Sequence, residues 1–136
     1  MSEIVFETKL TIARKLEDNL IECVRVKDAP KLIDEKLALK DIEALKKEVE
    51  KNPCVGFLFI VPNENVSLKA RKAYSLVENY GAGMALVVES TSQRMIANFV
   101  VKFSKSESQT KFFNTKAKAL EWIRQQIDIK VNTQIK

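Results

Sequence analysis

Carboxylates, thiols and lysines are the side chains of this chain that could do chemistry, because its 136 residues include no histidine. The commonest general base is therefore missing, and with it every Ser-His or Cys-His nucleophile pair. Carboxylates lie close together at Asp34-Glu35 and at Glu48 and Glu50. Both groups fall in or beside a lysine-rich helical segment, where a solvated surface is the simpler interpretation. We expect no catalytic activity.

The two cysteines and three glycines do not predict a metal or nucleotide site. Cys23 and Cys54 each lie in an apolar run, so we expect reduced, buried thiols, with a disulfide or a reactive thiol as the alternatives. Two isolated cysteines without histidine do not indicate a zinc site. The segment Gly81-Ala82-Gly83 precedes a predicted strand rather than opening a helix, so it matches neither nucleotide fingerprint. We expect no cofactor.

The net charge of +5 is unevenly distributed along the chain. Residues 1–52 hold 11 basic and 12 acidic side chains, whereas residues 53–136 hold 12 basic and 6 acidic ones. A nucleic acid, an anionic ligand or an acidic protein surface suits the basic half, although a solvated lysine-rich surface is the plainer interpretation. The basic patch of this hypothesis consists of Arg94, Lys102, Lys105, Lys111, Lys116 and Lys118. We do not favour nucleic acid, since the phenylalanines are better explained as core than as stacking platforms.

The elements that must position these residues begin with a β-hairpin. An alternating stretch from Phe6 to Leu16 is followed by turn residues Glu17-Asp18-Asn19 and by a second run, Leu20 to Val26. A helix then begins between Asp34 and Leu39 and ends at about Lys51.

The helix carries one apolar face, whose members recur at spacings of four, three and four residues: Ala38, Ile42, Leu45 and Val49. The uncharged stretch Cys54–Val61 does not alternate, which predicts a central strand covered on both faces. Ser67 is placed to cap the next helix, whose apolar stripe runs from Val66 to Tyr80, with Gly81 at its end. Ala82–Val88 is the next predicted strand.

The last part of the chain predicts a helix, an edge strand and a final helix. Ser90 to Gln93 resembles a capping box, followed by a helix that reaches Phe103. Thr110 to Phe113 reads as a short edge strand. Asn114 or Thr115 then caps a helix with Leu120, Ile123 and Ile127 turned inward, and residues 128–136 form a frayed tail. This order predicts one α/β domain, with a mixed sheet flanked by about four helices.

The C-terminal half contains three segments with a recognisable pattern: Arg94-Met95-Ile96-Ala97-Asn98-Phe99, Phe112-Phe113-Asn114 and Ala119-Leu120-Glu121-Trp122-Ile123. With them, the chain resembles bacterial SpoIIAA-like proteins of the STAS-like superfamily. The resemblance implies a hairpin-plus-parallel sheet like that of anti-sigma-factor antagonists, and a regulatory role in binding a protein partner. Some relatives are switched by phosphorylation of a Ser or Thr at the loop-to-helix junction after a central strand, which here is Asn65–Ser67. The usual Asp-Ser pair is absent, since Ser67 follows Val66.

The resemblance therefore implies a recognition surface formed by Asn65, Ser67, Lys69, Arg71 and Lys72. A small apolar ligand held between the sheet and the helices is an alternative that rests on fold analogy alone. An exposed sheet edge also leaves a homodimer open. The lack of a secretory signal, the free cysteines and the absence of a long apolar run lead us to expect a cytoplasmic protein with no membrane contact.

Overall fold

The computed structural model describes residues 3–62, 65–77, 79–88 and 109–135. The strands are β1 (Ile4–Glu7), β2 (Thr11–Glu17), β3 (Leu20–Arg25), β4 (Leu32–Ile33), β5 (Gly56–Val61), β6 (Asn65–Val66), β7 (Gly83–Val88) and β8 (Thr110–Phe113). The helices are α1 (Glu35–Lys51), α2 (Leu68–Ser75) and α4 (Lys116–Ile135).

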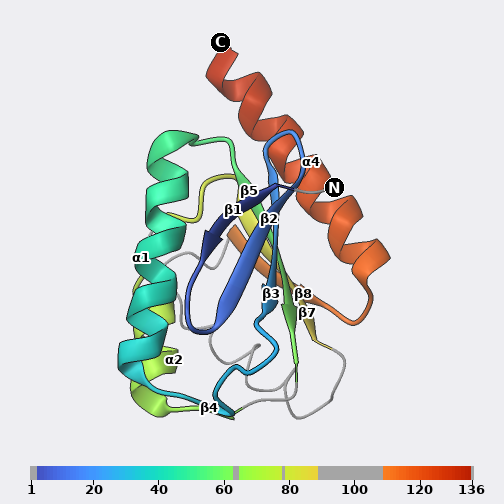
Figure 1. The fold of residues 1–136 in the computed structure, drawn as a ribbon. Coiled ribbons are helices and arrows are strands. Elements are labelled where there is room, and N and C mark those ends of the chain that lie inside the picture. Colours follow the sequence, from blue (N-terminus) through green and yellow to red (C-terminus); the bar gives the residue numbers. More distant parts are fainter. Residues whose placement is uncertain (1–2, 63–64, 78, 89–108, 136) are drawn as a thin grey trace.

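These elements form three layers (Figure 1). A six-stranded sheet lies in the middle, in the order β1-β2-β3-β5-β7-β8. Helices α1 and α2 cover one face, and α4 crosses the other (Figure 1). The strands β1, β2 and β3 pair antiparallel, whereas β3, β5, β7 and β8 pair parallel. The predicted mixed α/β sheet, built from an N-terminal hairpin and parallel central strands, is therefore confirmed.

The hairpin turn uses the residue that its sequence suggested. Asn19 adopts a left-handed backbone with φ 67°, a conformation that Asn tolerates better than most residues. Its carbonyl also accepts a hydrogen bond of 2.7 Å from the backbone N–H of Gly56. The turn between β2 and β3 is thereby joined to the start of the central strand.

The central position of β5 is confirmed. It pairs with β3 on one side and β7 on the other, and Gly56, Phe57, Leu58 and Phe59 are all buried. Phe57 and Phe59 contact the core under α1, while Leu58 joins the core under α4. A strand buried on both faces needs apolar side chains at successive positions, which explains why this stretch does not alternate.

Helix α1 begins and ends where the sequence predicted. The Asp34 side chain accepts a hydrogen bond of 2.9 Å from the backbone N–H of Leu37, which caps the first turn. All four residues of the predicted stripe are buried, and so are Asp41 and Glu48 on the same side of the helix. The burial of these two carboxylates was not predicted.

Helix α2 is shorter than we predicted. It ends at Ser75, although Val77 and Tyr80 of the expected stripe are indeed buried. The Tyr80 hydroxyl donates a 3.1 Å hydrogen bond to the carbonyl of Tyr74, so the chain folds back against the helix end. Periodic burial continued, but helical hydrogen bonding did not. Gly81, with φ 70°, belongs to the turn before β7.

Three further features differ from the prediction. The helix α4 continues to Ile135 instead of fraying after Ile127, and Val131 packs against the core on that side of the sheet. The short strands β4 and β6 form a separate parallel pair that we did not predict. The described residues contain three helices rather than about four. The remaining predicted helix, together with its capping box at 90–93, lies outside the described residues.

Candidate functional site

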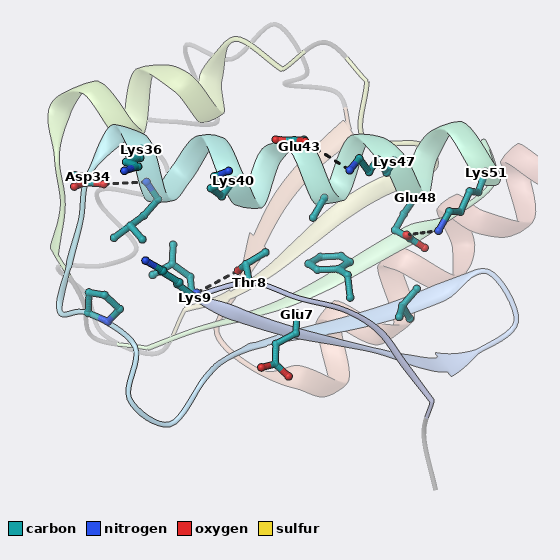
Figure 2. Close-up of a pocket in the computed structure, with 16 residues that line it drawn as sticks. Glu7, Thr8, Lys9, Asp34, Lys36, Lys40, Glu43, Lys47, Glu48 and Lys51 are labelled. Atoms are coloured by element: carbon teal, nitrogen blue, oxygen red, sulfur yellow. Dashed lines mark hydrogen bonds and ion pairs between the residues drawn. The ribbon is translucent and has the colours of Figure 1, made fainter.

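A groove runs between the edge strand β1 and helix α1 (Figure 2). Its volume is about 710 Å³. Half-buried apolar residues, including Val5, Phe6, Leu37 and Ala44, line its inner part. Charged side chains surround them: Glu7, Lys9, Asp34, Lys36, Lys40, Glu43, Lys47, Glu48 and Lys51.

Most of these carboxylates already have partners. Glu43 forms an ion pair with Lys47 at 3.6 Å, and Glu48 forms one with Lys51 at 3.3 Å. Asp34 is occupied as the helix cap, and Glu7 points away from α1 (Figure 2). In contrast, Lys9, Lys36 and Lys40 are exposed and have no ion-pair partner within the described part of the chain. The lining therefore holds five lysines against four carboxylates, and three of the lysines carry no ion-pair partner within the described residues.

A buried polar network holds the two walls of this groove together. Asp41 of α1 is 1% exposed and accepts hydrogen bonds from the Thr8 hydroxyl at 2.6 Å and the Thr11 hydroxyl at 2.9 Å. The Arg25 Nη1 of β3 lies 3.0 Å from Asp41 Oδ2 and donates to Thr11 Oγ1 at 2.8 Å. The Arg25 guanidinium also lies 5.3 Å from the ring centroid of Phe59. The turn after β1 is thereby attached to α1.

Sequence reasoning missed this network. The sequence did contain a signal for this network, which is the position of a carboxylate on the apolar face of a helix. Asp41 falls one residue before Ile42 and three after Ala38, on the buried side of α1. A carboxylate on an apolar stripe needs hydrogen bonds and an opposite charge to be buried at acceptable free-energy cost. The identity of the partners depends on the tertiary structure.

A second groove, of about 410 Å³, lies between α1 and α2. Leu39 of α1 and Leu76 at the end of α2 line it and are 50% and 52% exposed. Lysines dominate its rim, where Glu35 is the one carboxylate among the described lining residues. The rim lysines are Lys46, Lys69 and Lys72, all exposed.

The predicted recognition surface is therefore partly assembled. Lys69 and Lys72 line the second groove, Asn65 is exposed in β6, and Arg71 is half-buried beside them in α2. Ser67 has a structural role, since its hydroxyl accepts a 3.1 Å hydrogen bond from the backbone N–H of Ala70.

The junction that carries Ser67 is also held by backbone contacts. The Asn65 N–H donates to the Lys31 carbonyl, and the Ser67 N–H donates to the Ile33 carbonyl, both at 2.9 Å. The mini-sheet of β4 and β6 thus orients the start of α2.

The alternative basic patch is only partly placed. Arg94, Lys102 and Lys105 lie outside the described residues. Of the others, Lys116 forms a 2.7 Å ion pair with Glu22, and Lys111 lies 5.6 Å from the ring centroid of Phe113. Lys118 is exposed in the first turn of α4.

Both cysteines are free, as expected, but only one is buried. Cys23 is fully buried in β3, and burial raises the pKa of its thiol far above the ordinary value, with a further contribution from Asp41. Cys54 is half-buried, contrary to our prediction.

Within the described residues, no group of three or more His, Cys, Asp or Glu side chains is arranged to hold a metal ion. None of the described helices combines the length and the apolar composition that a membrane span needs.

Comparisons with known proteins give a family and a fold. The sequence profile of a family described as a domain of unknown function, DUF7793, matches residues 15–127. A crystal structure of an uncharacterised DUF3478 protein with a SpoIIAA-like fold, from Shewanella loihica PV-4, superposes with a TM-score of 0.57 at 16% identity. The match covers 90% of this chain and 95% of that one, and it confirms the SpoIIAA-like fold. A search of curated proteins finds no match.

Proposed function

Since this chain belongs to the DUF7793 family, a domain of unknown function, we propose from its surface that it is a non-catalytic, regulatory protein-binding module. The supporting observation is the groove between α1 and α2, where half-exposed Leu39 and Leu76 lie among three exposed lysines and one carboxylate. Exposed apolar side chains beside a groove are typical of interaction sites. The anti-sigma-factor antagonists that the fold resembles also act by binding proteins.

The chemistry of the groove selects the kind of partner. Two adjacent helices with leucines between them suit an amphipathic helix, whose apolar face enters a helix-lined groove. The rim lysines Lys46, Lys69 and Lys72 have no ion-pair partners among the residues described. An acidic partner helix would satisfy them, and charge complementarity would speed its association.

Affinity capture from the native cell tests the proposal, with three forms of the protein as bait. The groove variant is Leu39→Asp/Leu76→Asp. The matched control is Ile129→Asp, which changes an exposed apolar residue on α4, outside the groove. The expected result is one partner captured by wild type and control but lost from the groove variant, with all three baits equally folded by circular dichroism. Equal capture by all three baits would exclude this groove.

The nucleic-acid alternative has less support. A phosphate-binding surface needs several cations that are free to contact the backbone. Of the three predicted patch lysines in the described residues, Lys116 is neutralised by Glu22. Fluorescence anisotropy with a labelled oligonucleotide at low salt is expected to show no binding.

A further inference from the structure

Strand β1 forms one edge of the sheet and pairs only with β2 among the described strands. Within the described residues, the backbone N–H and C=O groups on its other side are therefore not used by a neighbouring strand, and the pairing with β2 shifts register between Ile4 and Phe6. Such an edge is a template on which an extended peptide can pair. Ile4, at the start of β1, is 49% exposed.

The groove beside β1 adds an apolar surface next to this edge. Val5 and Phe6 of β1 pack against the core beneath α1, and both also line the groove. Leu37 and Ala44 line its α1 side. Alternate side chains of an added strand would point toward the α1 face of the sheet and contact these residues.

The charge of the groove specifies what else the added strand must carry. Lys36 and Lys40 are exposed on α1, next to the groove, and they are separated by one helical turn, a rise of about 6 Å. Acidic side chains two residues apart on an extended peptide are about 7 Å apart, a close match. The exposed Lys9, in the turn after β1, adds a third cation.

The walls are held in place before any ligand arrives. The hydrogen bonds from Thr8 and Thr11 to Asp41 fix the turn after β1 against α1. A site whose walls are already positioned loses less conformational entropy on binding.

We propose that the β1 edge and the groove under α1 bind an extended acidic segment of a partner protein by strand addition. A second copy of this chain fits the site less well, because pairing of two β1 edges would bring the exposed Lys9, Lys36 and Lys40 of each copy near one another. This site lies on the opposite side of α1 from the Leu39 groove, so it can succeed or fail independently of the function proposed above.

A designed peptide provides a defined probe for fluorescence anisotropy. Its sequence, Thr-Val-Thr-Glu-Thr-Glu-Thr-Val with an N-terminal fluorophore, places two glutamates and two valines on one face of a strand. The same peptide with lysine in place of both glutamates is the charge control. Two further versions carry N-methyl groups on alternate residues, one on the Thr positions and one on the others, because only one set of N–H groups can face β1.

The expected result is saturable binding of the acidic probe to the full chain, no binding of the lysine probe, and loss of binding for one N-methylated version only. The Lys36→Glu/Lys40→Glu variant should weaken binding at least about fivefold, from the loss of two exposed ion pairs. The matched controls Lys118→Glu and Lys69→Glu/Lys72→Glu should bind as wild type.

Three outcomes would overturn the proposal. The first is equal binding of both N-methylated peptides, which excludes strand pairing. The second is equal affinity of Lys36→Glu/Lys40→Glu and wild type, which excludes this groove. The third is light scattering that shows a dimer disrupted by the same two substitutions, which makes a second copy the occupant of the edge.

Discussion

Arg25 and Asp41 form a buried ion pair that joins strand β3 to helix α1. Arg25 Nη1 lies 3.0 Å from Asp41 Oδ2, and the two side chains are only 11% and 1% exposed. The Thr8 and Thr11 hydroxyls donate to the same carboxylate. Of these four residues, Thr8 lines the groove between β1 and α1, and its hydrogen bond to Asp41 fixes that wall against the helix. The network that stabilises the fold therefore also shapes the proposed peptide site.

Replacing Asp41 with Asn should strongly destabilise the protein. The substitution keeps the shape of the side chain but removes the carboxylate beside a buried guanidinium, which costs about 3 kcal/mol. Urea unfolding followed by circular dichroism measures the change. The control Glu43→Gln breaks an exposed pair with Lys47 and should cost less than about 1 kcal/mol. Equal midpoints for the two variants would contradict the assigned role of Asp41.

The ion pair between Glu17 and Arg124 should make stability depend on pH. The hydrogen bonds from Arg124, 2.8 and 3.0 Å long, lower the pKa of Glu17 below its ordinary value of 4.5. Because the folded-state pKa is lower than the unfolded one, the pair stabilises the fold above about pH 4.5, and this contribution is lost as pH falls through the folded pKa.

Carboxyl NMR titration tests this pair directly. In the Arg124→Gln variant, the pKa of Glu17 should rise relative to wild type. High salt should shift the wild-type pKa in the same direction, since both side chains are about half exposed. An unchanged Glu17 pKa in the variant would show that Arg124 does not hold the carboxylate in solution.

Ser67 should behave as a helix cap. Ser67→Ala removes the acceptor for the Ala70 N–H and should cost about 1 kcal/mol of unfolding free energy. Ser67→Asp should retain most of the stability, since Asp also caps helices and its charge favours the N-terminus. Thermal melts of the three proteins at one pH provide the comparison. If Ser67→Ala has the same melting temperature as wild type, the Ser67 hydroxyl contributes nothing to stability as a cap.

The two thiols should differ sharply in reactivity. The reactive form of cysteine is the thiolate, which burial disfavours at Cys23 by raising its pKa, whereas Cys54 is half-buried. Alkylation with iodoacetamide, followed over time by mass spectrometry, should modify Cys54 first in the native protein. Cys23 should react only under denaturing conditions. Similar native rates for both residues would show that the β3 core opens readily.

The predicted ends of two helices differ from the structure, because tertiary contacts rather than the local sequence pattern decide where those helices end. The stripe ending at Tyr80 predicted a longer helix, because burial recurs at helical spacing there even though the chain turns back after Ser75. The final helix continues beyond Ile127 because Val131 finds a place on the core. The periodicity of apolar residues indicates which residues are buried, but it does not indicate which backbone groups form hydrogen bonds with each other.

The sequence by itself determined the local elements: the turn at Asn19, the α1 stripe, the central strand β5 and the Ser67 cap. Each follows from residues within a few positions of one another, whose preferences act before the chain is folded. Only the tertiary structure decided that Thr8, Arg25 and Asp41 meet, that α1 is flanked by two grooves, and that β1 is left at an edge. These relationships join segments far apart in sequence, so they depend on how the layers pack.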